Sequence, residues 1–314
     1  MRRLLRIPAC APLLTLSILL GGCTTEQYAR RLLHPNLTYG KAAEAALPSG
    51  PTMVRLGLID AHRRVPTADG IEIDAWILAA QAPVGAPARG TVLLLHGLAD
   101  SKASHLSLAR RLSRRGFHAV LIDHRCHGRS TGRYVTWGDR EKLDARRVLD
   151  TLLAERLVRE PVFAFGHSMG ATTAILYAAA DPRCRGVVAA APYAHGRAVT
   201  RRFVPLMSDE QFEAVWQHAG QVGGFDPDAT SAIAAAERLT CPLIILHGTG
   251  DAICPYAHGK AIHAACRAPA RLETVPLGGH VTILAGREAW IADRIGELAA
   301  MAGLPAPANE GHPE

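Results

Sequence analysis

The feature that most constrains the fold is an alternation of short apolar runs with longer segments of helical periodicity. The first run, Thr91–Gly97, is continuously apolar, as is typical of a buried strand. The next segment, Ser101–Arg115, has apolar residues at helical spacing and is followed by Gly116, which favours a helix end. Further strands are expected at Phe117–Asp123, Pro161–Gly166, Gly186–Ala191, Pro242–Gly248 and Arg271–Pro276. This alternation predicts a mostly parallel, doubly wound sheet with right-handed crossovers and helices on both faces.

Two further strands precede this alternation and complete the expected sheet. Ile59–Pro66 and Ile71–Ala79 are expected as strands joined by a turn, which gives a sheet of about eight strands. Helices are expected at Asp139–Arg156, Met169–Ala180, Tyr256–Cys266 and Arg287–Met301. The α/β domain is therefore expected to cover residues 56–302, and the polar, Pro-rich residues 303–314 to form a loose tail.

The composition excludes other classes of protein. Hydrophobic residues make up 48% of the 314 residues and charged residues only 20%, which excludes a disordered chain. Three arginines of the first six residues contribute to the net charge of +7, and the other arginines are scattered or lie on expected helix faces; aromatic residues make up only 5%. We interpret these arginines as solvated helix surface, so nucleic acid is not expected as a partner.

The first 23 residues have the pattern of an export signal. Three arginines among the first six residues precede an apolar run from Leu13 to Leu20, and this run is too short to cross a membrane comfortably. The segment Leu20–Cys23, LGGC, resembles the lipobox of bacterial lipoproteins. The resemblance implies that residues 1–22 are a signal peptide and that Cys23 becomes lipidated after its removal. An uncleaved anchor or a plain secretory signal is the alternative.

A lipid on Cys23 would anchor the protein to a membrane without spanning it. Residues 23–55 would then form a lead-in to the domain. Thr24 is not the Asp that favours inner-membrane retention in such lipoproteins. The expected location is therefore the bacterial cell envelope, at the outer membrane or its periplasmic face if the source is Gram-negative.

The segment Gly166–Gly170, GHSMG, lies between an apolar strand and an Ala-rich helix. This is the context of a nucleophile elbow, G-x-S-x-G, in which small residues at both ends permit a tight strand-to-helix turn. The turn would expose the Ser168 hydroxyl at the top of the sheet, beside the free N–H groups of the helix N-terminus. Ser168 is therefore the predicted nucleophile, and an ordinary helix-cap serine is the alternative.

Two further polar residues follow the carboxyl ends of the last two expected strands, and they are Asp251 and His280. Active sites of open α/β sheets form at this edge, and Ser168, Asp251, His280 is the chain order of a triad on such a sheet. His280 is the predicted general base, and Asp251 is predicted to orient it. Asp226 and Asp228 compete with Asp251, but their context indicates a turn and a helix cap.

Residues 96–101, HGLADS, end the first long apolar strand. The backbone N–H of Leu98 is predicted to be one oxyanion-hole donor and that of Met169 the other. Both would meet the negative charge that develops on a tetrahedral intermediate. Three histidines that flank motifs are interpreted as packing or loop hydrogen-bonding residues: His96, His167 and His247.

With these motifs in this order, the chain resembles the α/β-hydrolase family of serine hydrolases over about residues 55–302. The segment Asp123–Gly132 resembles the D-x-R-G-H-G-x-S stretch of that family, with Cys126 in place of Gly. Tyr134–Asp144 resembles its bacterial esterase- and peptidase-like branch. The resemblance implies the α/β-hydrolase fold and hydrolysis of a small-molecule carboxylic ester through an acyl-enzyme, with no cofactor and no metal.

These motifs define the triad better than the substrate, so other functions stay open. One is a peptidase or a thioesterase on the same triad. A peptidase is expected to carry an acidic cluster or a second domain that holds peptide ends, and residues 193–238 show neither clearly. The other is a non-catalytic envelope lipoprotein that binds a ligand, but binding alone would not need three triad residues.

Residues 193–238 interrupt the alternation and are expected to form a small lid insertion. Ser208 begins a capping box, after which three apolar residues fall on one helical face. These residues are Phe212, Val215 and Trp216. The face is predicted either to pack on the body of the domain or to line an acyl or alcohol pocket as well.

The remaining cysteines and histidines do not predict a metal site. His124, Cys126 and His127 lie on a loop that the family resemblance already explains. Five cysteines follow Cys23 in the chain, namely Cys126, Cys184, Cys241, Cys254 and Cys266. One hypothesis is a Cys184–Cys241 disulfide, with Cys266 as a rival partner for Cys241.

Overall fold

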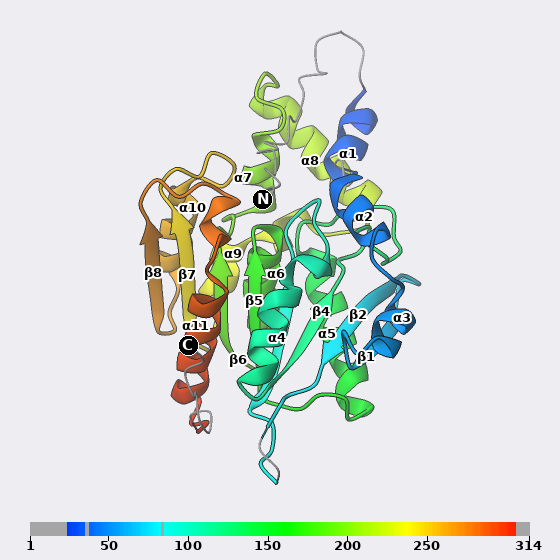
Figure 1. The fold of residues 1–314 in the computed structure, drawn as a ribbon. Coiled ribbons are helices and arrows are strands. Elements are labelled where there is room, and N and C mark those ends of the chain that lie inside the picture. Colours follow the sequence, from blue (N-terminus) through cyan, green and yellow to red (C-terminus); the bar gives the residue numbers. More distant parts are fainter. Residues whose placement is uncertain (1–23, 35–37, 83–84, 306–314) are drawn as a thin grey trace, which may run out of the picture.

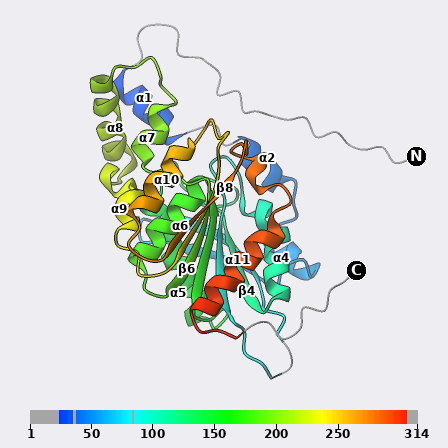
Figure 2. The same ribbon diagram turned by 90° about the vertical axis from the view of Figure 1, so that its left-hand side faces the viewer.

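The computed structural model describes residues 24–34, 38–82 and 85–305. The expected signal segment and Cys23 lie outside these described residues. The described chain forms one eight-stranded sheet with helices on both faces (Figure 1; Figure 2), which confirms the predicted architecture. The strands are β1 (Ala61–Pro66), β2 (Glu72–Leu78), β3 (Gly90–Leu95), β4 (Phe117–Ile122), β5 (Val162–His167), β6 (Cys184–Ala190), β7 (Leu243–Gly248) and β8 (Ala270–Val275).

The strand order is β1-β2-β4-β3-β5-β6-β7-β8. β1 pairs antiparallel with β2 and β2 antiparallel with β4, whereas the other pairs are parallel. β3, β5 and β7 are buried along their whole length because helices cover both faces of the sheet. Their sequences are therefore continuously apolar rather than alternating, which is why they could be located from the sequence.

Eleven α-helices and three short 3-10 helices accompany the sheet in the described part of the chain. The N-terminal helices are α1 (Thr25–Leu33), α2 (Thr38–Ala45) and α3 (Gly50–Arg55). Those between strands are η1 (Lys102–His105), α4 (Leu106–Arg114), α5 (Asp139–Ala154), α6 (Met169–Ala180), α7 (Gly196–Arg201), α8 (Asp209–Gly223), η2 (Pro227–Thr230), α9 (Ala232–Ala236) and α10 (Tyr256–Ala265). The last two are η3 (Thr282–Leu284) and α11 (Glu288–Met301).

Each face of the sheet has its own hydrophobic core. On one face α5, α6 and α9 pack on the strands through residues such as Val148, Ile175 and Ala235. On the other face α4 and α11 contribute residues such as Leu112 and Ile295. The segment expected as one helix over residues 101–115 is divided into η1 and α4, which form a single covering layer with α11 (Figure 2).

A third apolar cluster, the lid core, lies above the carboxyl edge of the sheet. It joins α8 to α1 and includes Met169, which begins α6. The α8 residues of this cluster are Phe212, Val215, Trp216 and Ala219, and the α1 residues are Ala29, Leu32 and Leu33. Residues 24–55, expected only as a lead-in, therefore contain three helices, the first of which packs on the lid (Figure 1).

The disulfide hypothesis is not supported. All five cysteines of the described chain are free thiols, and Cys184 and Cys241 lie in side-chain contact without being bonded. They meet because β6 and β7 are adjacent parallel strands that start at the same edge of the sheet.

The helices within residues 24–34, 38–82 and 85–305 include none that is long and apolar enough to cross a membrane.

Candidate active site

Ser168 stands at a sharp turn between β5 and α6. Its backbone has φ 55° and ψ −117°, a conformation that side chains rarely adopt, and its N–H donates to the carbonyl of Ala190 at 2.8 Å. Two glycines permit this turn. A Cβ at Gly166 would lie 2.1 Å from the carbonyl oxygen of Gly170, and one at Gly170 would lie 2.1 Å from that of Leu95. The GHSMG segment thus packs backbone against backbone, as a nucleophile elbow requires.

The structure brings Ser168, His280 and Asp251 into one hydrogen-bonded chain. The Ser168 hydroxyl lies 2.8 Å from His280 Nε2, and His280 Nδ1 lies 2.7 Å from Asp251 Oδ2. An ionised carboxylate only accepts, so Nδ1 carries the proton and Nε2 accepts from the serine hydroxyl. The Ser168 residue is 8% exposed and the His280 side chain 9% exposed, so this chain is partly shielded from water.

Asp251 is held by partners on both carboxylate oxygens. Oδ1 accepts from the N–H groups of Ile253 at 2.9 Å and Cys254 at 2.8 Å, while Oδ2 accepts from His280. Burial alone would raise the pKa of Asp251, but these hydrogen bonds outweigh burial and its pKa lies below the ordinary value. The carboxylate is therefore charged at neutral pH and can stabilise a protonated His280.

Leu98 and Met169 lie on the two segments that flank Ser168. Met169 is the first residue of α6 and is fully buried, so its N–H belongs to the free N-terminal turn of that helix. Leu98 follows Gly97, at which an added Cβ would lie 3.5 Å from Ser168 Cβ. The Leu98 loop is fixed by the N–H of Ala99, which donates to His127 Nε2 at 3.2 Å.

The three histidines interpreted as packing or loop residues each hold a segment of the site. His167 Nε2 lies 2.9 Å from the His280 carbonyl, and His247 Nε2 lies 2.8 Å from the Cys254 carbonyl. His96 Nδ1 lies 2.7 Å from the carbonyl of Gly97, next to Leu98. Burial, together with the neighbouring His280, lowers the pKa of His167 to about 4, so this ring stays neutral and can donate to that carbonyl.

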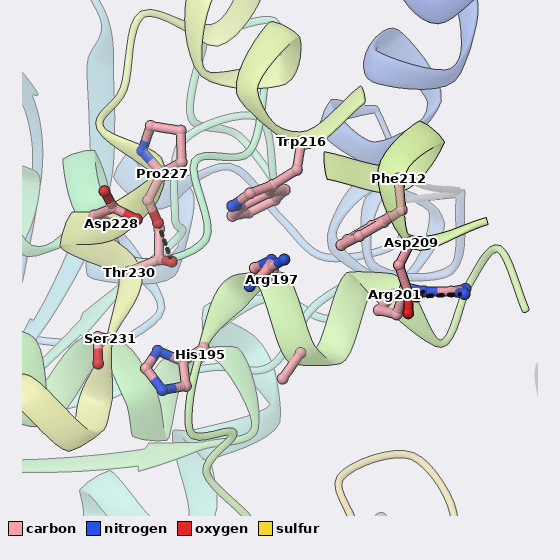
Figure 3. A pocket seen from close by; sticks show the side chains of 11 residues that line it. His195, Arg197, Arg201, Asp209, Phe212, Trp216, Pro227, Asp228, Thr230 and Ser231 are labelled. Carbon is pink, nitrogen blue, oxygen red and sulfur yellow. Dashed lines mark hydrogen bonds and ion pairs between the residues drawn. The ribbon is translucent and has the colours of Figure 1, made fainter. Parts of the chain in front are cut away.

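The predicted pocket face of α8 both packs and lines a cavity. Val215 is buried in the lid core, whereas Phe212 and Trp216 also border a cavity of about 490 Å³ between α7, α8 and η2 (Figure 3). The other lining residues are His195, Arg197, Ala198, Arg201, Asp209, Pro227, Asp228, Thr230 and Ser231. Ser168, His280 and Asp251 are not among the lining residues, so a role of this face in substrate binding stays a prediction.

Sequence reasoning missed Cys254 as a site residue. Its N–H binds Asp251, its carbonyl is held by His247, and its fully buried thiol lies against the Ser168 hydroxyl. Burial raises the pKa of this thiol well above the ordinary value, so it stays protonated. The only signal in the sequence was its position three residues after Asp251.

Among the described residues no cluster of His, Cys, Asp and Glu side chains could hold a metal ion, and this includes the loop from His124 to His127.

Known proteins resemble the chain over its central part. Residues 86–217 match the family described as Serine aminopeptidase, S33. YqkD of Bacillus subtilis is 26% identical over 227 residues, which are 69% of this chain and 71% of YqkD. The lysophosphatidylserine lipase ABHD12 of Macaca fascicularis is 27% identical over 201 residues, 59% of this chain and 47% of that lipase. The esterase Pf2001 of Pyrococcus furiosus superimposes with a TM-score of 0.59 at 18% identity, covering 76% of this chain and 91% of the esterase.

The sheet order and the sharp turn at Ser168 are those of the α/β-hydrolase fold. The match over residues 86–217 and the similar folds agree with that class. The chain therefore has the α/β-hydrolase fold, and its residues 86–217 are similar to the S33 serine aminopeptidase family.

Proposed function

We propose that the protein hydrolyses carboxylic esters with Ser168, His280 and Asp251 as its catalytic triad. The observation that carries this proposal is the hydrogen-bonded chain from the Ser168 hydroxyl through both nitrogens of His280 to Asp251. No separate base, cofactor or metal is required, because this chain can generate the nucleophile and store its proton.

The reaction proceeds in two steps. Ser168 Oγ attacks the ester carbonyl while His280 Nε2 takes its proton, and Asp251 stabilises the resulting imidazolium. The N–H groups of Leu98 and Met169 receive the negative oxygen of the tetrahedral intermediate. His280 then returns the proton to the alcohol, which leaves an acyl-Ser168, and a water activated by the same histidine releases the acid.

An ester is favoured over a peptide by the apolar surroundings of the nucleophile. Met169, Cys254 and the partly buried Leu98 belong to the lid core, so an acyl group attached to Ser168 would meet apolar side chains. The lipase and the esterase among the similar proteins act on esters by name.

Two functions from the sequence remain as competitors, with the S33 match favouring the first. They are a peptidase or thioesterase that uses the same triad, and a lipoprotein that only binds a ligand. We propose further that Cys23 carries a lipid that holds the protein in the cell envelope, on the outer membrane in a Gram-negative source. The basis is the LGGC segment after a basic, then apolar start.

Labelling of the full chain with a fluorophosphonate probe tests the proposed function. The wild type should gain one adduct, and Ser168→Ala should gain none. Ser49→Ala, which changes an exposed helix-capping serine, is the matched control and should label like the wild type. Turnover of p-nitrophenyl esters from acetate to octanoate, beside amide and thioester analogues, then separates the three reactions. Folded protein that neither labels nor turns over any ester would contradict the proposal and favour a ligand-binding lipoprotein.

A further inference from the structure

Large apolar side chains are exposed on the lid and on the loops that carry Asp251 and His280. In the described part of the chain, the three most exposed are Leu277 at 90%, Leu206 at 76% and Val281 at 66%, and Ile253 is 37% exposed. Exposed apolar residues that are scattered singly are normal on a protein surface, whereas a cluster indicates an interaction. We call these four residues the apolar rim.

Each residue of the rim lies on a triad-bearing loop or on a segment that is hydrogen-bonded to one. Leu277 and Val281 lie on the loop that carries His280, and the N–H of Ile253 donates to Asp251. Leu206 lies in the segment between α7 and α8, which is fixed to the same region because Arg202 donates to the Ala252 carbonyl at 2.8 Å. The rim is therefore formed by the lid and by the loops after β7 and β8.

Leu277 is a poor choice for a residue that has only a structural role. Its φ of 56° lies in the left-handed region, where Gly or Asn is favoured, and its side chain gains nothing from packing in the isolated protein. A strained and exposed leucine beside the base is best explained by contact with something apolar outside the molecule.

The position of the N-terminus identifies what that apolar partner is. α1 packs on α8, so the described chain begins at the lid, with Thr24, the residue that follows Cys23 in the sequence. The start of α1 and the segment between α7 and α8 lie at the same end of the molecule, at the top of Figure 1. A lipid on Cys23 would therefore hold this end, and not the opposite edge of the sheet, against the membrane.

We propose that the apolar rim rests on a phospholipid bilayer and that the active site receives the ester bond of a lipid directly from it. The substrate part of this inference rests on the proposed esterase function, whereas the membrane contact does not. Insertion of a few apolar side chains beside a covalent lipid supplies the second signal that stable membrane attachment needs.

Tryptophan scanning tests the contact in the full chain. Leu206→Trp places a reporter on the rim, and Leu143→Trp, at a residue of α5 that is 44% exposed, is the matched control. With vesicles of brominated phosphatidylcholine, the added fluorescence of the Leu206→Trp variant should be quenched and that of the Leu143→Trp variant should not. Equal quenching of both, or of neither, would overturn the proposed orientation. If the protein instead forms a concentration-dependent dimer that shields only the tryptophan at residue 206 from quenching, the partner of the rim is a second copy of the chain and not a bilayer.

A rim variant tests the lipid substrate. Leu277→Asn with Val281→Ser should lower hydrolysis of a long-chain p-nitrophenyl ester in phosphatidylcholine vesicles by about tenfold, because apolar contact with the bilayer is lost. Hydrolysis of soluble p-nitrophenyl acetate should stay within about twofold of the wild type. Leu56→Ser, at a distant residue that is 59% exposed, should change neither rate. Equal losses of activity on both substrates would overturn the proposal that the substrate comes from the bilayer. A wild type that does not hydrolyse p-nitrophenyl acetate would contradict the proposed esterase function, but the fluorescence test of membrane contact would still hold.

Discussion

The two carboxylate oxygens of Asp251 accept hydrogen bonds from different partners. A substitution can therefore remove the charge of Asp251 and keep its shape. Oδ1 accepts from two backbone N–H groups and Oδ2 accepts from His280. In Asp251→Asn the amide oxygen can keep the two backbone bonds, but the NH₂ group would face His280 Nδ1. That arrangement favours the tautomer with its proton on Nε2, which cannot accept the proton of Ser168.

Asp251→Asn should therefore lower kcat on a soluble ester by roughly 10³–10⁴-fold while the protein stays folded. The measurement is kcat with p-nitrophenyl acetate, beside a urea unfolding curve for each protein. Asp228→Asn is the matched control, because Asp228 is the competing carboxylate of the lid and is exposed. A loss of less than tenfold for Asp251→Asn would remove Asp251 from the proposed triad.

At the residue scale, the sequence predicted which side chains meet but not what holds them. Ser168 and Asp251 could be found because they follow continuously buried strands, and His280 because it follows the last expected strand; the carboxyl ends of these strands share one edge of the sheet. The role of Cys254, and the partner to which His167 binds, could not be found in this way. Their contacts depend on where a loop folds back, and no local periodicity records that path.

At the scale of elements, the N-terminal arm is the main difference between expectation and structure. α1 and α3 begin at polar caps that the sequence does contain, since Thr24 and Gln27 form a capping box and Ser49 precedes Gly and Pro. These helices are short, and short helices owe their stability to tertiary contacts. The partner of α1 is α8, almost 200 residues away in sequence. The helices of the N-terminal arm therefore could not be predicted from their own sequence alone.

Lys102 fastens this arm to the body of the domain. Its ammonium group is fully buried and lies 2.6 Å from Glu44 of α2, 3.0 Å from Asp74 and 2.5 Å from Asp123. Burial would lower the pKa of Lys102, but the three carboxylates outweigh it and the pKa lies above the ordinary value. The ring of Trp76 faces the same ammonium at 4.4 Å. Removing this cation would leave buried carboxylates without their counter-charge.

Lys102→Met should therefore reduce the free energy of unfolding by about 3–5 kcal/mol, because it breaks a buried ion cluster from one side. Lys260→Met is the matched control, since Lys260 is exposed on α10 and its replacement should change stability by less than about 1 kcal/mol. Urea unfolding at neutral pH measures both values. Equal, small changes would show that the cluster does not hold the arm in place.

At the scale of the whole molecule, the sheet was predictable and its accessory layers were not. The central strands followed from apolar runs, because helices cover them on both faces. The lid was located only as an interruption of that rhythm. Its packing on α1, and the lid core that both form, required the tertiary structure. The thiols of Cys184 and Cys241 show the same limit, since topology brought them together but could not decide whether they bond.

The buried histidines beside the Leu98 loop make the whole fold sensitive to acid. His127 packs edge to face against His96, also touches His124, and accepts a hydrogen bond from Ala99. Burial, and then the nearby His96, lower the pKa of His127 to about 3. The unfolded chain binds a proton near the ordinary histidine pKa of about 6.5, which the folded chain cannot do. The stability that the neutral ring supplies is therefore complete above that value and is lost as the pH falls towards 3.

His127→Gln isolates this contribution, because glutamine can accept from Ala99 without titrating. Between pH 7.5 and pH 5.0 the free energy of unfolding of the wild type should fall by about 2 kcal/mol more than that of the variant. Urea unfolding of both proteins at the two pH values gives this difference directly. The variant can be less stable at pH 7.5 because it loses ring contacts, so only the difference between the two pH dependences is diagnostic. If the two proteins show the same pH dependence, His127 binds a proton as readily in the folded protein as in the unfolded chain. In that case His127 does not make the Leu98 loop sensitive to acid.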